Sequence, residues 1–290
     1  MKPSAVALGT FDGFHIGHQH LIRKLEATAR KYKLRSILVT LSAPVRRSSL
    51  LLTSLDEKLE ILKRQPLNEI IVLHTGTEVT SMPARLFFDD FLIKQLNVKH
   101  IVVGANFAFG HNREGDIAWL KKACASSSIK IDAVNPVKYH GEVVSSSRIR
   151  ALLHEGNVNT ANTLLGRAYS ITGLPQPGLR IGRKLGFPTV NLAVSPGKLL
   201  PPGIFAGVTL RKNKFYPSIV NIGTRPSIVE KGSLLTEIHL LDYKGNWPRE
   251  KTQLFLLKHL RAEKKFNSMP ALAKQIEKDR NKARVFFNND

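Results

Sequence analysis

The stretch that decides the fold is GTFDGFHIGH at residues 9–18, which directly follows the apolar run AVAL at residues 5–8. A short apolar run that leads into glycines and then into a helical pattern is typical of a strand, a tight turn and a helix. The helical pattern is clear because four apolar residues share one of its faces: Leu21, Ile22, Leu25 and Ala29. We therefore expect the chain to begin with a β-strand, a turn and an α-helix.

The same alternation continues through the first half of the chain. Four further runs of strand length are rich in Val and Ile, at residues 36–41, 70–73, 101–103 and 129–134. Amphipathic segments separate these runs, and one of them places Leu86, Phe87 and Phe91 on a common helical face. Strands that alternate with helices predict a parallel sheet, which binds its ligands at the carboxyl ends of the strands. Residues 9–18 follow the first strand, so they fall where a ligand site belongs.

Two histidines give residues 9–18 their chemical character. His15 and His18 are three residues apart and lie on one side of the opening turn of the helix. Gly13 and Gly17 let the backbone approach a ligand closely, and a helix N-terminus attracts phosphate. Adenylyl transfer needs mainly alignment and electrostatic stabilisation, which two imidazoles supply at this place. The pair is also compatible with a metal site or with packed structural residues, although no third ligand stands at metal-site spacing nearby.

Two later runs point to the same end of the sheet. GANFAFG at residues 104–110 follows a strand and offers the amide of Asn106 and two aromatic rings, which belong either to the core or to a ligand platform. VSSSRIR at residues 144–150 begins a helix that stops before Gly156, so its hydroxyl and N–H groups form a second anion site. Capping needs one serine, whereas three are present, and Arg150 can hold a polyphosphate.

The second half of the chain has a different texture. From residue 169 to about residue 257 short extended runs are broken by frequent Gly and Pro, which predicts an all-β barrel or sandwich. A polar link at residues 157–162 precedes this region, and a helix at residues 269–287, capped by Ser268, follows it. A length of 290 residues fits two domains. We therefore expect an α/β domain over residues 1–160 and an all-β domain with a C-terminal helix over residues 161–290.

The all-β half opens with a second chemically dense run, GLRIGRKLGFPTVN at residues 178–191. Its glycines, Gly182 and Gly186 among them, permit a tight loop around a phosphate, and Arg183 supplies charge. Thr189 and Asn191 are two apart on a strand, so they point to the same side and suit Mg²⁺. A Gly- and Pro-rich barrel turn is the alternative interpretation. The run lacks a Walker lysine–serine pair, so a P-loop kinase is excluded.

The motifs of the first half resemble the HxGH and ISSTxxR signatures of the nucleotidylyltransferase superfamily. They are similar in particular to the adenylyltransferase module of the prokaryotic bifunctional riboflavin kinase/FAD synthetase family, which implies a Rossmann-like α/β fold with a parallel sheet. In this resemblance His15 and His18 are catalytic and stabilise the α- and β-phosphates of ATP. It assigns the following residues to nucleotide and phosphate binding: Gly9, Phe11, Asp12, Gly13, Gly17, Gly104, Asn106, Ser146, Ser147 and Arg150.

The second half resembles the small β-barrel riboflavin kinase domain of the same family. The similarity covers the PTxN signature at residues 188–191 and further segments at residues 166–169, 221–226, 237–242, 261–266 and 275–279. It implies that Gly182, Arg183 and Gly186 bind phosphate, that Thr189 and Asn191 bind Mg²⁺–ATP, and that Glu237 is the catalytic base.

The chain departs from the family pattern at four places. Ser147 and Ser227 replace threonines, and residues 41–46 lack the usual Phe-acid-Pro-His-Pro segment. Residues 246–249 read NWPR where the family usually has Asp-Leu-Tyr-Gly. The last change lies in the barrel half, so it bears on the kinase reaction.

The net charge of +22, from 44 Lys and Arg against 22 Asp and Glu, attracts polyanions. The basic residues are scattered and no nucleic-acid module signature accompanies them, so we expect the phosphates of ATP and flavins, rather than nucleic acid, as partners. Cys124 is the only cysteine, and no apolar run approaches the length of a membrane span. We expect a cytoplasmic protein without membrane contact; the sequence places no constraint on its oligomeric state.

The resemblance implies two reactions. The barrel phosphorylates riboflavin to FMN with ATP and releases ADP, and the α/β domain joins FMN to the AMP part of ATP, which gives FAD and pyrophosphate. One alternative is an FAD synthetase whose barrel binds flavin without phosphorylating it, as the changes at residues 41–46 and 246–249 suggest. Another is a basic flavin- or nucleic-acid-binding regulator on the same scaffold, against which the joint presence of His15, His18, Thr189, Asn191 and Glu237 argues.

Overall fold

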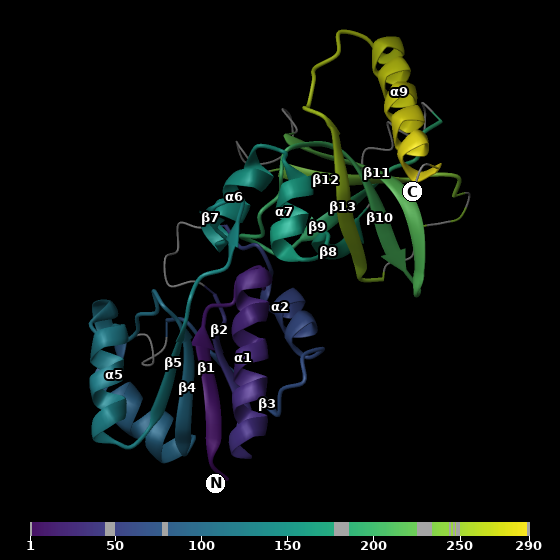
Figure 1. The fold of residues 1–290 in the computed structure, drawn as a ribbon. Coiled ribbons are helices and arrows are strands. Elements are labelled where there is room, and N and C mark those ends of the chain that lie inside the picture. Colours follow the sequence, from purple (N-terminus) through teal and green to yellow (C-terminus); the bar gives the residue numbers. More distant parts are fainter. Residues whose placement is uncertain are drawn as a thin grey trace. The chain divides into compact units, whose positions relative to one another are not determined.

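The computed structural model describes residues 2–43, 50–76, 81–176, 186–224, 234–243, 245, 247 and 250–288. The chain folds into two compact units, Met1–Ser146 and Ser147–Asp290, and each is described by itself (Figure 1). The division by contacts falls before the expected boundary between residues 160 and 161. That boundary stays a prediction about the extent of the two functional domains.

The first unit is built on a five-stranded sheet in which every neighbouring pair of strands is parallel. The sheet order is β3-β2-β1-β4-β5. The strands are β1 (Ser4–Gly9), β2 (Arg35–Leu41), β3 (Glu69–Leu73), β4 (Val98–Gly104) and β5 (Lys130–Val134). The predicted parallel α/β sheet is therefore confirmed. Because β2 and β4 flank β1 on opposite sides, the order of the strands reverses at β1, and ligands bind at such a point.

Helices cover both faces of this sheet (Figure 1). Ala5 and Ala7 of β1 pack in one buried cluster with Leu25, while Val6 and Leu8 pack in another with Leu92. This alternation follows from the period of two in a strand. The helical elements of the unit are α1 (Ile16–Tyr32), α2 (Leu55–Leu62), α4 (Ala84–Leu86), the π-helix η1 (Phe87–Gln95), the 3₁₀ turn η2 (His111–Arg113) and α5 (Ile117–Ser126), and a short hairpin pairs β6 (Lys138–Tyr139) with β7 (Glu142–Val143).

The expected face of Leu86, Phe87 and Phe91 is only partly correct. Phe87 and Phe91 lie together, with ring centroids 5.1 Å apart, whereas Leu86 is exposed. The helix changes to π geometry at Phe87, so side chains no longer repeat every 3.6 residues. Phe88 and Leu92 are buried together with Phe87.

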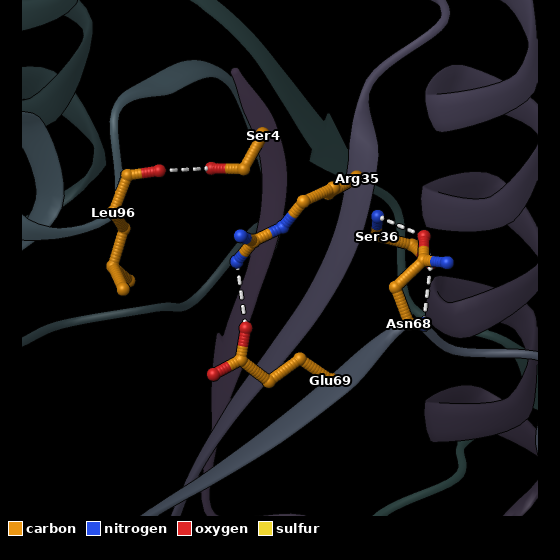
Figure 2. A network of polar contacts seen from close by, with 6 residues as sticks. All are labelled: Ser4, Arg35, Ser36, Asn68, Glu69 and Leu96. Carbon is orange, nitrogen blue, oxygen red and sulfur yellow. Dashed lines mark hydrogen bonds and ion pairs between the residues drawn. The ribbon is translucent and has the colours of Figure 1, made fainter. Parts of the chain in front are cut away.

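A polar network ties the amino ends of the strands, away from the ligand edge (Figure 2). The Ser36 N–H and hydroxyl both donate to Asn68 Oδ1, at 2.9 and 3.0 Å, and the Asn68 N–H donates to Ser36 Oγ at 3.1 Å. On the same strands Arg35 and Glu69 form a more exposed ion pair of 2.6 Å. The buried half of the network therefore holds β2 in register with the turn that precedes β3.

Replacing Asn68 with alanine should destabilise the first unit by about 1–3 kcal/mol, because two Ser36 donors lose their acceptor. Urea unfolding followed by Trp119 fluorescence in a Trp247→Phe background measures this, since Trp119 lies in the first unit. Replacing Glu69 with alanine is the matched control and should cost under about 1 kcal/mol, as expected of an exposed ion pair. Equal losses in both variants would contradict this account of the network.

The second unit contains a closed six-stranded barrel, which decides between the barrel and sandwich alternatives. Its order is β10-β11-β12-β9-β8-β13. The strands are β8 (Tyr169–Gln176), β9 (Val190–Val194), β10 (Gly203–Arg211), β11 (Lys214–Thr224), β12 (Leu234–Leu240) and β13 (Thr252–Arg261). The helix α6 (Ser146–His154) begins at the last residue of the first unit. No helix in the described part of the chain is long and apolar enough to cross a membrane.

The polar link expected at residues 157–162 is wrong, because this segment forms the helix α7 (Val158–Leu165). Asn157 caps it by accepting from the Thr160 N–H at 3.3 Å, and Gly166 ends it in a left-handed conformation. Val158 and Leu164 are buried, and the helix contacts β13 and β8 of the barrel. The polar residues lie on the other side of the helix. Their number made the segment look like a polar link, although the segment is an amphipathic helix.

The C-terminal helix α9 (Met269–Asn288) packs on the outer face of the barrel, and Ser268 caps it as expected. Ala283 lies in one buried cluster with Ile204 of β10 and Ile219 of β11. Asp279 is buried and accepts three hydrogen bonds of 2.8–3.1 Å from the Arg261 guanidinium at the end of β13. This bidentate pair anchors the helix beside the face that carries Ile204.

Candidate active sites

The loop after β1 is held in an unusual backbone conformation. Phe11, Gly13 and Phe14 all have positive φ, at 49°, 79° and 39°. Side chains rarely adopt this region, so the surrounding structure must hold the loop in place. Both phenylalanines are buried in the core cluster under α1 and act as anchors. The surrounding fold therefore sets the backbone conformation of this loop.

Asp12 fastens the same loop from its other side. Its carboxylate accepts from the Leu52 N–H at 3.2 Å, from the Thr53 N–H at 3.0 Å and from the Thr53 hydroxyl at 3.2 Å. The Thr53 hydroxyl oxygen accepts in turn from the Gly13 N–H at 3.1 Å. The Ser146 hydroxyl donates to the Asp12 carbonyl at 2.9 Å, so this serine of the later motif is joined to the loop. The side chains of Phe11 and Asp12 thus shape the loop, and their roles as nucleotide contacts stay predictions.

The two histidines are stacked at the N-terminus of α1. Their ring centroids are 3.7 Å apart at an angle of 17°, and Phe11 packs 5.1 Å from the His18 ring. The His18 N–H donates to His15 Nδ1 at 3.4 Å, which caps the helix. A neutral His15 that accepts at Nδ1 carries its proton on Nε2, so Nε2 can donate to a phosphate oxygen. A Cβ at Gly17 would lie 3.1 Å from the His15 ring, which explains the glycine between them.

The topology brings the run at residues 104–110 to the same edge. β1 pairs with β4, so Gly104 at the end of β4 neighbours the loop that follows Gly9. Asn106 is exposed there. Phe107 and Phe109 stack with centroids 5.6 Å apart and pack against the core, yet both remain half-buried. The rings are therefore part of the core while still reaching the surface.

Ser147 and Arg150 follow Ser146 in α6 but belong to the second unit. Ser147 is exposed, and Arg150 is half-buried. Their contact with phosphates remains a prediction that rests on the motif. Gly182 and Arg183, like residues 44–49 and Asn246, Pro248 and Arg249, lie outside the described residues.

Lys58 is a buried residue of this edge that the sequence motifs do not indicate. Its ammonium donates to the carbonyls of Thr10, at 3.2 Å, and of Leu41, at the carboxyl ends of β1 and β2. Burial lowers the pKa of Lys58 from 10.5 to about 8, and the Asp12 carboxylate opposes this shift. A positive charge is thus held under the sheet edge where phosphates are expected. It could be found only from the fold, because Lys58 lies on a helix among other charged residues.

The lowered pKa of Lys58 predicts a pH-dependent stability. Between pH 8 and 10.5 the folded chain has released this proton and the unfolded chain still holds it, so the stability rises with pH in that window. Relative to the variant Lys58→Met, the free energy of unfolding of the wild-type first unit should rise by on the order of 3 kcal/mol across this pH window. Urea unfolding followed by Trp119 fluorescence at pH 7.5 and 10.5 measures the difference. If wild type and Lys58→Met differ in stability by the same amount at both pH values, the pKa of Lys58 is not lowered.

The barrel brings three polar residues into one row across three strands. Asn191 of β9 pairs directly with Glu237 of β12, and Glu237 pairs directly with Asn221 of β11. Directly paired residues of antiparallel strands point to the same face with their Cβ atoms about 5 Å apart. The next residue in the row is Ile204, which belongs to the cluster under α9. The row therefore lies on the outer face of the barrel.

The surroundings of this row are polar. Glu263 lies over the glycine two residues after Asn221, because a Cβ at Gly223 would meet its carboxylate at 2.0 Å. His239 shares the face, and its Nδ1 lies 2.9 Å from the Pro188 carbonyl, next to exposed Thr189. Burial lowers the pKa of His239, so this imidazole is mainly neutral at pH 7. Gly186 precedes these residues with a φ of 81°. The face thus offers hydroxyl, amide and carboxylate oxygens to a ligand.

Residues 1–148 match the FAD synthetase family, and residues 165–287 match the riboflavin kinase family. The chain is 33% identical over 294 residues to the bifunctional riboflavin kinase/FMN adenylyltransferase of Buchnera aphidicola subsp. Schizaphis graminum, covering 98% of this chain and 94% of that protein. It is 34% identical over 298 residues to the enzyme of that name from Escherichia coli strain K12, and the match covers 97% of this chain and 92% of that protein. This chain belongs to the bifunctional riboflavin kinase/FMN adenylyltransferase family.

The bifunctional riboflavin kinase/FMN adenylyltransferase family accounts for the two units and their order along the chain. A solved structure described as a macrolide-efflux protein from Streptococcus pneumoniae shares the fold over both units, with a TM-score of 0.87 and 28% identity, and covers 98% of this chain and 94% of that one. The stacked histidines lie in the part that matches FAD synthetase, and the row of Asn191, Glu237 and Asn221 lies in the part that matches riboflavin kinase.

Proposed function

We propose that this chain phosphorylates riboflavin to FMN and then adenylylates FMN to FAD, with ATP as the donor in both reactions. The observation that carries the proposal is that each unit holds a pair of motif residues side by side. The first unit stacks His15 and His18 at a helix N-terminus beside the end of β4, and the barrel places Glu237 opposite Asn191. A single chain with both sites can make and use FMN.

In the adenylyl transfer, an oxygen of the FMN phosphate attacks the α-phosphorus of ATP, and the bond to the β-phosphate breaks. FAD and pyrophosphate are the products. His15 and His18 donate hydrogen bonds to the phosphate oxygens on which negative charge grows, and the N–H groups after Gly13 and the dipole of α1 add to this stabilisation. Gly9, Gly104 and Asn106 line the same edge, and Ser147 and Arg150 hold the leaving phosphates.

In the kinase reaction, Glu237 accepts the proton of the terminal ribityl hydroxyl of riboflavin. The hydroxyl oxygen attacks the γ-phosphorus of ATP, and ADP leaves. A carboxylate in this role contributes about 10²–10⁴-fold to the rate. Gly182, Arg183 and Gly186 bind the phosphates of ATP in this proposal. Riboflavin and ATP are therefore the substrates of the barrel.

Mg²⁺ completes the proposal for the kinase site. This cation takes oxygen ligands and usually keeps several waters together with the substrate phosphates. The Thr189 hydroxyl and the Asn191 amide oxygen fit such a partial shell, and the strand pairing places Asn191 beside Glu237, which acts as the base in this proposal. When bound, Mg²⁺ would neutralise the phosphate charge and favour the departure of ADP. We also propose a cytoplasmic location, because the one cysteine, Cys124, is a buried free thiol and the chain can form no internal disulfide.

The test is to incubate the pure protein with riboflavin, ATP and Mg²⁺ and to separate the flavins. FMN together with FAD supports both activities. FAD formed only from added FMN supports an FAD synthetase whose barrel binds flavin without phosphorylating it. The departure from the family pattern at residues 246–249 would then be the reason for the lost kinase activity. No new flavin from either substrate would overturn the proposal and favour a regulator.

A further inference from the structure

We propose that Asn221 is a substrate-positioning residue of the kinase site, which holds a hydroxyl of the ribityl chain beside Glu237. This inference rests on the proposed riboflavin kinase activity and adds a residue to which the motifs give no role. It starts from the row on the outer face of the barrel, in which Asn191, Glu237 and Asn221 are consecutive partners across three strands.

The order of this row matches the order of the reacting groups. Asn191 stands on one side of the base, where the metal and the phosphate of ATP are proposed to bind. In a direct phosphoryl transfer the attacking alcohol lies between the phosphate and the rest of the acceptor molecule. If Glu237 takes the proton of that alcohol, the remaining hydroxyls of the acceptor lie on the side away from Asn191. The side chain that stands there is Asn221.

The state of the Asn221 side chain points to a ligand. Its Oδ1 atom is buried without a hydrogen-bond partner in the part of the chain that the structure describes. Such a group lowers the stability of the fold unless a partner is supplied. Rotation of the Asn221 amide exchanges its oxygen and its nitrogen, so the buried position holds a polar atom in either orientation. A hydroxyl both donates and accepts, so a polyol chain satisfies the amide either way.

The neighbouring Thr236 provides a matched comparison. Its Oγ1 is also buried without a partner among the described residues, but Thr236 is 1% exposed and pairs with Ile222 and Leu192, which are buried as well. Successive residues of a strand point to opposite faces, so Thr236 points into the barrel while Glu237 and Asn221 point outward. Asn221 and Thr236 thus each carry a buried oxygen without a partner among the described residues, the first beside the proposed site and the second in the interior of the barrel.

The experiment compares Asn221→Leu with Thr236→Val in the full-length chain. Both changes remove a buried polar atom that lacks a partner, so both should leave the thermal midpoint of the barrel unchanged or raised. Only Asn221→Leu should impair the kinase, with a KM for riboflavin about tenfold or more higher and a KM for ATP within about twofold. Lumiflavin, which has no ribityl chain, should inhibit both variants with an unchanged Ki. Asn221→Ala replaces Asn221→Leu if the larger side chain does not pack.

The outcomes separate this inference from the function on which it rests. If Glu237→Gln abolishes FMN formation while Asn221→Leu leaves the KM for riboflavin unchanged, the role of Asn221 is refuted and the kinase assignment stands. If Glu237→Gln retains FMN formation, the proposed kinase site itself is wrong. A thermal midpoint that is lowered in both Asn221→Leu and Asn221→Ala, or an equal loss of riboflavin and lumiflavin affinity, would mean that Asn221 serves the barrel structure instead. Conversion of added FMN to FAD should be unchanged in every variant and reports on the folding of the first unit.

Discussion

Replacing His15 or His18 with alanine should lower FAD formation from FMN at least about 100-fold, while FMN formation from riboflavin stays close to that of the wild type. The expected size is that of losing one preorganised donor to a charged transition state, about 10²–10³ in rate. The stacked rings, 3.7 Å apart at the start of α1, place both imidazoles where a phosphate binds. Steady-state rates of the two reactions, measured on the same preparation, check the prediction.

His15 also caps α1, so alanine at this position removes a cap as well as an imidazole. Asparagine is a good N-cap, and His15→Asn should therefore keep the stability of the first unit while it still loses FAD formation. His20→Ala is the matched control, because His20 is exposed on the same helix; it should keep both activities within about twofold. Near-normal FAD synthesis in the variants of both His15 and His18 would overturn the site assignment.

Replacing Glu237 with glutamine or alanine should abolish FMN formation and leave the conversion of added FMN to FAD intact. Glutamine has the shape of glutamate but cannot accept the hydroxyl proton at pH 7, and a lost general base costs about 10²–10⁴-fold. The residue pairs with Asn191 on one side and Asn221 on the other, so the same row should continue to bind riboflavin. The rate with saturating riboflavin should therefore fall far more than the KM changes.

Glu250→Gln is the control for this change, because Glu250 is an exposed carboxylate of the same unit that pairs with Lys212 at 3.6 Å. It should leave both reactions unchanged. Loss of FMN formation together with loss of FAD formation in Glu237→Gln would indicate misfolding rather than catalysis. A Glu237→Gln enzyme that still phosphorylates riboflavin would remove the residue from the mechanism.

Local patterns predicted most of the secondary structure correctly. All five strands of the parallel sheet lie where runs of Val and Ile stand, and α1 buries the four apolar residues of its predicted face. The patterns failed where local rules do not hold. Leu86 precedes a π-helix, whose spacing differs from 3.6, and α7 carries its apolar face among many polar residues.

The functional residues also divide into those that local motifs indicate and those that only the fold reveals. The motifs indicate His15, His18, Asn191 and Glu237, but not which neighbours complete each site. The carboxylate of Asp12 accepts from the N–H groups of Leu52 and Thr53, which the motif does not indicate, and its contact with the nucleotide stays a prediction. Lys58 belongs to no motif, and the family-like segment at residues 221–226 begins with Asn221 without giving this residue a role. Their roles follow from burial and from strand register, which are long-range properties of the fold.

The sequence by itself determined the order of an α/β unit and a β unit, the strand–turn–helix at residues 9–18, and the chemical groups of both motifs. These are local features, because periodicity, glycine conformation and the spacing of side chains act over a few residues. Only the tertiary structure decided that the β unit closes into a barrel, that Lys58 reaches the carbonyl ends of β1 and β2, and that Asn191, Glu237 and Asn221 form one row. The pairing of strands joins residues far apart in the chain, and a shift of one residue would turn every side chain to the opposite face.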